Sequence, residues 1–243
     1  MHIEAVPTNC LLSTNGFCLL PRAIPAATLA ELQLAFKAFA GAGDRINIAH
    51  PLVRQVAEAE WLQHLLQPHF MAPPFVVRAI AFDKSPQANW SVTWHQDLTI
   101  AIAERRDVPD FGPWSRKAGI PHVQPPTALL ERMLTARLHL DDAPVDNGAL
   151  RVLSGSHLGG RWSAEEIESL RESGSEFVCA ARAGDVLLMR PLLLHASSRA
   201  ENPRRRRVLH LEFADQRLPM GLEWGGWQAT IERTGLHQPA TSS

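Results

Sequence analysis

The residues with the clearest chemical potential are His95 and Asp97, which stand two positions apart in the sequence Trp-His-Gln-Asp. Side chains two apart on a β-strand project from the same face, so both could reach one metal ion. A neutral imidazole and a carboxylate are two of the three protein ligands in the facial triad of non-haem Fe(II) sites. The pattern alone is weak evidence, and a third ligand must come from elsewhere.

Among the eleven histidines, His195 is the best candidate for the third ligand. It ends an apolar run that begins at Gly184 and Asp185, which is typical of a buried strand. A strand from the opposite part of a β-sandwich could bring it beside His95. A buried histidine at a strand end is by itself more often structural, so the residues that follow it carry part of the argument.

A cluster of four arginines, residues 204–207, lies shortly after His195 and enters another strand pattern. A guanidinium binds a carboxylate through two parallel hydrogen bonds, so one inward-pointing arginine would suit an acidic cosubstrate. Strand alternation places Arg206, His210 and Glu212 on one face. Leu209, Leu211 and Phe213 share the other face. We expect Arg204 and Arg205 to be solvated.

Short β-like segments from about residue 75 must position these side chains. Many short strands separated by turns favour an all-β sandwich or barrel over a βαβ fold. Asn147-Gly148 predicts a hairpin between two of them. The candidate strands lie in residues 75–82, 89–97, 136–142, 149–153, 176–181, 185–189 and 206–213.

The first 74 residues are predicted to be a helical support. Pro25 opens one helix that Gly41 ends, and a second begins near Pro51. Ser163 and Glu166 form a plausible capping box for a later helix that stops at Gly174. The buried stripes of the two N-terminal helices are interpreted as core packing: Leu29, Leu32, Phe36 and Phe39 in the first, and Val53, Val56, Leu62, Leu65 and Leu66 in the second.

We predict one domain over residues 1–243, with a β core at 75–215 and a C-terminal extension at 216–243. Residues 98–132 are rich in Pro and Gly and fit neither a strand nor one clean helix. A long excursion of this kind is usually a functional lid or a disordered insert. Its position directly after His95 and Asp97 favours the lid.

Composition excludes several kinds of partner. The formal net charge is −1, so no global electrostatic attraction to nucleic acid or an anionic membrane is expected. No apolar stretch is long enough to span a membrane. Three scattered cysteines argue against a disulfide framework or a structural zinc site, and they fit a reducing, cytoplasmic setting. The partner is expected to be a small molecule in a pocket.

With these residues assembled, the chain resembles the phytanoyl-CoA dioxygenase family of Fe(II)/2-oxoglutarate-dependent oxygenases. The resemblance runs from about Ala81 to Phe213, with weaker similarity in the N-terminal helices. Order, spacing and flanking sequence all match the family. The segments that carry it are FDKSPQANWSVTWHQD, LHLDDAPVDNGALRVLSGSH, AGDVLLMRPLLLHASS and RRRRVLHLEF.

The resemblance implies a mainly β fold with supporting helices, a double-stranded β-helix (jelly roll, cupin-like). It also implies Fe(II) and 2-oxoglutarate as cofactors, O2 as a co-substrate, and hydroxylation as the usual reaction. Carried over by position, the iron ligands are His95, Asp97 and His195. The 2-oxoglutarate anchor is Arg206, with Arg207 as its rival because a slip in register would exchange them.

One departure from the family lies in a turn. The family's usual PGSH sequence reads Ser-Gly-Ser-His here and ends at His157, which we interpret as structural. This turn is separate from the expected iron ligands, so the departure does not change the oxygenase activity that the resemblance implies. Related iron halogenases carry a small residue in place of the carboxylate, so Asp97 favours hydroxylation or desaturation over halogenation.

The substrate site is less constrained by the sequence. Asn89, before the strand of His95, is a further candidate contact of 2-oxoglutarate. Candidate substrate residues are Trp90, Trp94, Trp114, Lys117, Arg137, His139 and His210. Two other functions stay open. One is a cupin-like iron oxygenase that does not use 2-oxoglutarate and would not need Arg206, and the other is a non-catalytic small-molecule binding module of the same fold.

Overall fold

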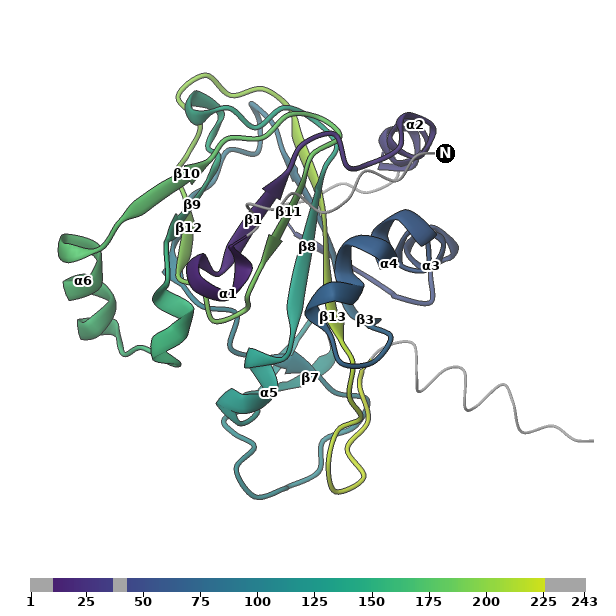
Figure 1. Ribbon diagram of the computed structural model, residues 1–243, viewed down its shortest axis with the longest axis vertical. Helices are drawn as coiled ribbons and strands as arrows, with labels where there is room; N and C mark the ends of the chain where they lie inside the picture. Colours follow the sequence, from purple (N-terminus) through teal and green to yellow (C-terminus); the bar gives the residue numbers. More distant parts are fainter. Residues whose placement is uncertain (1–10, 37–42, 226–243) are drawn as a thin grey trace, which may run out of the picture.

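Two antiparallel β-sheets face each other in the structure, a computed structural model that describes residues 11–36 and 43–225 (Figure 1). The larger sheet has the order β1 (Phe17–Leu20), β11 (Val186–Met189), β8 (Leu134–His139), β13 (Arg206–Ala214), β3 (Phe75–Lys84) and β2 (Asp44–Ile46). The smaller sheet has the order β10 (Glu176–Cys179), β9 (Leu150–Leu153), β12 (His195–Ser197) and β4 (Val92–His95). The mainly β, jelly-roll fold predicted from the sequence is confirmed.

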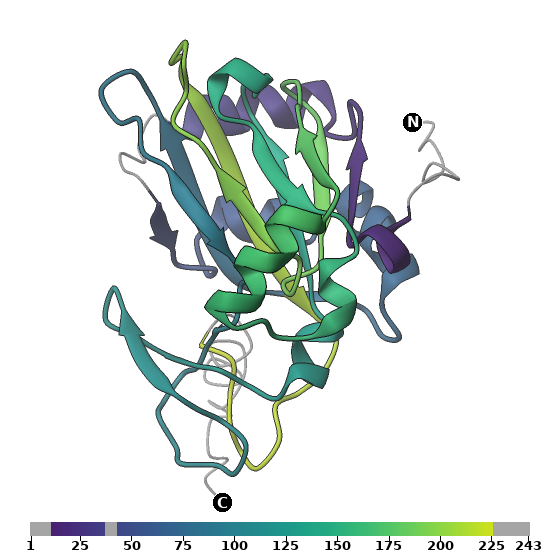
Figure 2. The same ribbon diagram turned by 90° about the vertical axis from the view of Figure 1, so that its left-hand side faces the viewer.

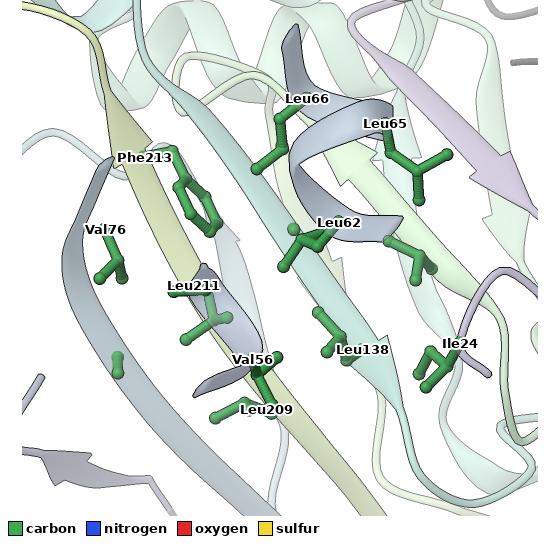
Figure 3. Packing of buried hydrophobic residues seen from close by; sticks show 14 of the residues in the cluster. Ile24, Val56, Leu62, Leu65, Leu66, Val76, Leu138, Leu209, Leu211 and Phe213 are labelled. Atoms are coloured by element: carbon green, nitrogen blue, oxygen red, sulfur yellow. The ribbon is translucent and has the colours of Figure 1, made fainter. Parts of the chain in front are cut away.

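Strand β13 shows how alternating side chains separate the hydrophobic core from the cavity between the sheets. Leu209, Leu211 and Phe213 point outward, where they pack against helices in the largest hydrophobic cluster (Figure 3). Arg206 and His210 point inward and line a cavity between the sheets. The sheet therefore buries an apolar face and presents a polar face to the interior of the sandwich, as the alternating sequence predicted.

Three helices cover the outer face of the larger sheet: α2 (Ala26–Ala35), α3 (Pro51–Ala57) and α4 (Glu60–Leu66) (Figure 1). The single helix predicted from Pro51 is two helices, because the chain takes an extended conformation at Ala59. The prediction of a purely helical N-terminal part is also wrong, since β1 and β2 form the two edges of the larger sheet. Phe39 and Gly41 lie outside the described residues.

The connection at Asn147-Gly148 is not a hairpin, which corrects the sequence prediction. It follows a short 3-10 helix, η3 (Val145–Asn147), and crosses from β8 in the larger sheet to β9 in the smaller sheet. Gly148 has a φ of 66°, and a Cβ there would lie 2.7 Å from the carbonyl oxygen of Ser198. The glycine is needed for this positive φ and for the close packing at the crossover. An Asn-Gly pair in a hairpin turn has the same local sequence, so the sequence alone does not separate the two cases.

Residues 98–132 are structured, although the sequence suggested no regular elements there. They form a three-stranded sheet, β5 (Ile100–Ala101), β7 (Ile120–Val123) and β6 (Trp114–Lys117), followed by α5 (Thr127–Glu131). Figure 2 shows this sheet below the sandwich, beside the chain that follows β13. Its strands are too short to give a clear periodic pattern, which explains the missed assignment.

The remaining short helices are α1 (Leu12–Asn15), η2 (Gln67–His69), η4 (Ser156–Gly159) and α6 (Ala164–Ser173). Helix α6 has the predicted capping box of Ser163 and Glu166 and ends at Gly174 as expected. Cys18 is disulfide-bonded, although the sequence indicated no disulfide framework. Within the described residues, no helix is long and apolar enough to cross a membrane.

Candidate active site

His95 and His195 meet between neighbouring strands of the smaller sheet. They are direct partners in the antiparallel register of β4 with β12, and their ring centroids are 4.1 Å apart. Asp97 follows β4, with its Oδ2 atom 3.8 Å from Nε2 of His195. One ligand atom from each of the three residues lies within 4.8 Å of the others, so the group could hold a metal ion.

Backbone carbonyls orient both imidazoles. Nδ1 of His95 lies 2.8 Å from the carbonyl oxygen of Thr93, and Nδ1 of His195 lies 2.8 Å from that of Leu193. A carbonyl oxygen can only accept a hydrogen bond, so each Nδ1 carries the proton. Each Nε2 then presents a lone pair, which is the arrangement of a metal-ligating histidine held by an outer partner.

Asp97 has a buried oxygen that needs a partner. Its backbone N–H donates to the carbonyl of Pro191 at 2.9 Å, which fixes the residue beside the histidines. Its Oδ2 atom makes no hydrogen bond among the described residues. An unpaired buried carboxylate oxygen is costly, and a cation bound by the three side chains would satisfy it. The residues present therefore fit a metal ion.

Protonation states also favour metal binding. Burial alone would raise the pKa of the Asp97 carboxyl, but His195 and the guanidinium of Arg78 hold that pKa well below its usual range. Burial, assisted by His95, lowers the pKa of His195 to about 3. At neutral pH the carboxylate is ionised and the His195 imidazole is neutral, as metal ligation requires.

A second group, formed by Asp97, His210 and Glu212, also lies within metal-binding distance, but two of its members contact each other. Nε2 of His210 contacts Oε1 of Glu212 at 3.2 Å, and Nη2 of Arg78 reaches the same oxygen at 2.9 Å. His210, Glu212 and Arg78 therefore form a polar network beside the first group.

An inner cavity of about 140 Å³ extends from the histidines between the sheets. Its lining includes Lys84, Arg137 and Arg206 on the inward faces of β3, β8 and β13. Nη1 of Arg206 donates to the carbonyl of Gly148, whereas its Nε has no partner within the described residues. The cavity is therefore a buried, cationic site suited to a small anion.

Arg207 points to the opposite face of β13 from Arg206. Its Nε and Nη2 atoms contact the two oxygens of Asp141 at 2.7 Å each, and its Nη1 donates to the carbonyl of Gln33. Arg207 therefore fixes α2 to the sheet and does not line the inner cavity. The register pairs Arg206 with Lys84 across β13 and β3.

Sequence reasoning missed Lys84 and Arg78, which line the inner cavity from β3. The Nζ atom of Lys84 donates to the carbonyl of Trp90 at 2.7 Å and to Oγ of Ser197 at 3.2 Å. Burial, together with the charge of Arg206 and then of Arg137, lowers the pKa of Lys84 to about 7. The available signal was that Arg78 and Lys84 share one face of an otherwise apolar strand with Ile80 and Phe82.

An outer cavity of about 390 Å³ adjoins the inner one at His95 and Asp97. The two cavities share Arg78, Ile80, Phe82, His95 and Asp97. Lys117 reaches the outer cavity from β6, and its Nζ donates to Oγ1 of Thr99 at 2.9 Å. His95 and Asp97 therefore lie where the smaller inner cavity meets the larger outer one, and His195 lines the inner cavity.

Among the candidate substrate residues, Trp90, Lys117, Arg137 and His210 line one of these cavities. His139 is buried on the inward face of β8 but is not part of either lining. Burial, together with Arg137 and Arg206, lowers its pKa to about 3. It is therefore a neutral histidine behind the cationic wall.

Three sequence candidates lie away from the cavities. Trp94 projects from the opposite face of β4 to His95, and the Arg151 guanidinium lies 5.3 Å from its ring. Trp114 stacks with Arg105 at 5.5 Å. The Asn89 amide exchanges two hydrogen bonds with the backbone of Ala200. These contacts leave the three candidates outside both cavity linings, because strand alternation and backbone pairing direct them elsewhere.

The fold and the site together define a class of protein. A jelly roll that holds two histidines and one carboxylate beside a cavity is the arrangement of mononuclear non-haem iron oxygenases. The chain belongs to the phytanoyl-CoA dioxygenase (PhyH) family, whose model matches residues 12–208.

Solved structures share the fold at low sequence identity. The carbocyclase SnoK from nogalamycin biosynthesis, described as non-haem and α-ketoglutarate-dependent, has a TM-score of 0.66 at 16% identity, covering 100% of this chain and 96% of its own. The epimerase SnoN, in complex with Fe3+, α-ketoglutarate and nogalamycin RO, has a TM-score of 0.63 at 17% identity, with coverage of 84% and 80%. HygX from Streptomyces hygroscopicus, with nickel and 2-oxoglutarate bound, has a TM-score of 0.60 at 18% identity, with coverage of 88% for each chain. A comparison with curated protein sequences found no match.

Proposed function

We propose that this protein is an Fe(II)/2-oxoglutarate-dependent dioxygenase that hydroxylates a small molecule and releases succinate and CO2. One observation carries the proposal. His95, Asp97 and His195 converge where the cationic inner cavity of Arg206 meets the open outer cavity. A cosubstrate in one cavity and a substrate in the adjoining one would therefore reach the same metal ion. The proposal treats residues 1–243 as one oxygenase domain.

The three proposed ligands would hold Fe(II) through the Nε2 atoms of His95 and His195 and through the carboxylate of Asp97. When bound, the iron supplies the redox chemistry that couples O2 reduction and 2-oxoglutarate decarboxylation to substrate oxidation. The chain supplies two imidazoles and an ionised carboxylate at fixed positions. Because both histidines lie on paired strands, little reorganisation accompanies metal binding.

Arg206 is the proposed anchor for the distal carboxylate of 2-oxoglutarate. It is buried, and its Nε is unpaired within the described residues. It shares the inner cavity with Lys84, and Asp97, a proposed metal ligand, is the only carboxylate among the described lining residues. A dicarboxylate would satisfy these charges, and a guanidinium can bind its terminal carboxylate through two hydrogen bonds. The size of the inner cavity favours a compact ligand, and the substrate is assigned to the larger outer cavity.

The comparisons with known proteins support the assignment of iron and 2-oxoglutarate as cofactors. Family membership implies dioxygenase chemistry, and the structural relatives SnoN and HygX contain iron or nickel together with α-ketoglutarate or 2-oxoglutarate. Hydroxylation is our proposal within that class, because SnoN and SnoK are described as an epimerase and a carbocyclase. Product analysis separates these reactions. A hydroxylated product gains one oxygen atom, an epimer keeps its mass, and ring closure removes two hydrogen atoms.

The test begins with anaerobic addition of Fe(II) and then 2-oxoglutarate to purified protein. We expect the weak visible charge-transfer band of an iron chelate in the wild type. His195→Ala should abolish it, and Arg206→Ala should require at least about ten-fold more 2-oxoglutarate, because a charge-assisted contact is lost. A folded protein that binds iron but gives no band would favour an iron oxygenase that does not use 2-oxoglutarate. A folded protein that binds no iron would favour a non-catalytic binding module.

A further inference from the structure

The outer cavity carries positive charge from three separate elements. Arg45 reaches it from β2, Arg78 from β3 and Lys117 from β6. In Figure 2 the hairpin of β6 and β7 lies below β2, on the same side of the sandwich. The cations therefore surround one opening, although they are far apart in the sequence.

Arg78 is neutralised within the protein, whereas the other two cations are not. Its guanidinium contacts Glu212 at 2.9 Å and Asp97 at 3.7 Å. Asp97 is the only carboxylate among the described lining residues of this cavity, and the proposed metal site uses it. Neither Arg45 nor Lys117 forms an ion pair within the described part of the chain.

The environment of Lys117 shows the effect of the excess of cations over carboxylates in the outer cavity. The side chain is half-buried, and within the described residues its hydrogen-bond partner is the neutral hydroxyl of Thr99 at 2.9 Å. Burial lowers the pKa of Lys117, and the charges of Arg78 and Arg45 lower it further, against smaller opposing effects of Asp97 and Glu212. A bound anion would offset these unfavourable terms, because opposite charge stabilises the protonated amine.

The same cavity has an apolar wall next to the proposed metal ligands. Ile80 and Phe82 line it from β3, and Leu98 lines it from the segment that follows Asp97. A ligand that reached Lys117 and Arg45 with an anionic group would therefore lay its remaining atoms along a hydrocarbon surface. This surface continues to the metal ligand His95, which lines the same cavity.

We propose that the substrate is an anionic amphiphile whose carboxylate or phosphate is bound by Lys117 and Arg45 while its apolar part lies along Ile80, Phe82 and Leu98. The inference rests on the proposed function, since it assigns the substrate class of the same site. The anion site is distinct from the 2-oxoglutarate site, because Arg206 lines only the inner cavity and Lys117 lines only the outer one.

The experiment compares matched ligands of the outer cavity by isothermal titration calorimetry. The probes are 4-phenylbutanoate, its neutral amide and a phenylalkyl phosphate, each added anaerobically to protein that already holds Fe(II) and saturating 2-oxoglutarate. We expect the carboxylate or the phosphate to bind at least about ten-fold more tightly than the amide, since a charge-assisted contact is retained. The tighter of the two anions identifies the headgroup.

Three variants and one matched control locate the effect. Lys117→Gln and Arg45→Gln should each reduce the preference for the anion over the amide by about ten-fold, and Lys117→Arg should restore it in part. Arg116→Gln is the matched control, because Arg116 is the exposed neighbour of Lys117 on β6, does not line the cavity and donates to the carbonyl of Gly119. It removes the same charge from the same hairpin and should keep the wild-type preference.

Equal binding of the anion and the amide by the wild type would overturn the proposal. So would an unchanged preference in both Gln variants, or failure of both anions to bind at millimolar concentration. The iron chelate band, recorded on the same samples, reports the proposed function separately. Should the band be absent, the same titrations on metal-free protein still measure the anion preference, so failure of one proposal is distinguishable from failure of the other.

Discussion

His195 lies directly opposite His95 in the antiparallel pairing of β12 with β4, with the two ring centroids 4.1 Å apart. Strand register, rather than a flexible loop, therefore sets the separation of the two imidazoles. The register shifts between His195 and Ser197, so the pairing is regular at the histidine and irregular just beyond it. A one-residue slip would turn His195 to the other face of the sheet.

Replacing Asp97 by Asn should weaken Fe(II) binding by at least about ten-fold, because the substitution keeps the shape of the side chain and removes the anionic ligand. Anaerobic titration with Fe(II), followed by equilibrium dialysis, measures the change. Asp107→Asn is the control, since Asp107 is an exposed acid that pairs with Arg105 outside both cavities. Wild-type metal affinity in Asp97→Asn would contradict the ligand assignment.

Arg206→Gln should weaken 2-oxoglutarate binding, whereas Arg207→Gln should lower the stability of the fold. Arg206→Gln should raise the 2-oxoglutarate concentration needed for half of the chelate band by at least about ten-fold. Arg207→Gln should leave that concentration unchanged and lower the free energy of unfolding by about 2 kcal/mol, because it breaks two contacts with Asp141. Paired titrations and urea unfolding of both variants measure the two quantities. Weaker 2-oxoglutarate binding in Arg207→Gln alone would reverse the assignment.

Lys84 should make 2-oxoglutarate binding depend on pH near neutrality. Its pKa is lowered to about 7 by burial, by Arg206 and by Arg137, so the ammonium form is present below that pH and lost above it. Affinity for the dianion is expected to fall, by up to about ten-fold, as pH rises from about 6 to about 8. Titration of the chelate band at several pH values measures this.

Two variants of Lys84 separate its titration from other effects of pH. Lys84→Met removes the titrating group and should flatten the pH profile at low affinity. Lys84→Arg keeps a charge that does not titrate in this range and should flatten the profile at higher affinity. A wild-type slope that persists in both variants would show that another group is responsible.

His139 should destabilise the protein in acid. Its pKa is lowered from 6.5 to about 3 by burial, by Arg137 and by Arg206, so the unfolded chain takes up a proton that the folded chain does not. The free energy of unfolding should therefore fall as pH drops from about 6.5 towards about 3, with a contribution from this residue of up to about 1.4 kcal/mol per pH unit. Urea unfolding of metal-free His139→Leu should show a correspondingly smaller slope, and an unchanged slope would count against this assignment.

Leu211 should contribute strongly to stability because it is fully buried between β13 and the helices of the outer layer. Leu211→Ala is expected to lower the free energy of unfolding by about 2–5 kcal/mol through lost burial and a residual cavity. Leu34→Ala, at an exposed position on α2, should change it by less than about 0.5 kcal/mol. Denaturant unfolding of the two variants checks the difference, and similar losses in both would falsify this packing model.

The sequence by itself determined the elements whose signals are local. Alternation along residues 206–213 separated the apolar face of Leu211 from the polar face of Arg206, because successive side chains on a strand project to opposite sides. The capping box at Ser163 and the spacing of His95 and Asp97 are local for the same reason. A distinctive set of segments, rather than any one of them, also indicated the family and the jelly roll.

Tertiary structure decided which distant residues share the site. Asn147-Gly148 has the local signature of a hairpin, yet it crosses between sheets because β8 and β9 find their partners elsewhere. Trp94 carries an aromatic side chain next to a proposed ligand, yet strand alternation turns it away. Lys84 and Lys117 lie on different strands, and only the packing of β3 within the sandwich and of β6 beside it places one in each cavity. Such convergence depends on long-range register and packing, which no short stretch of sequence encodes.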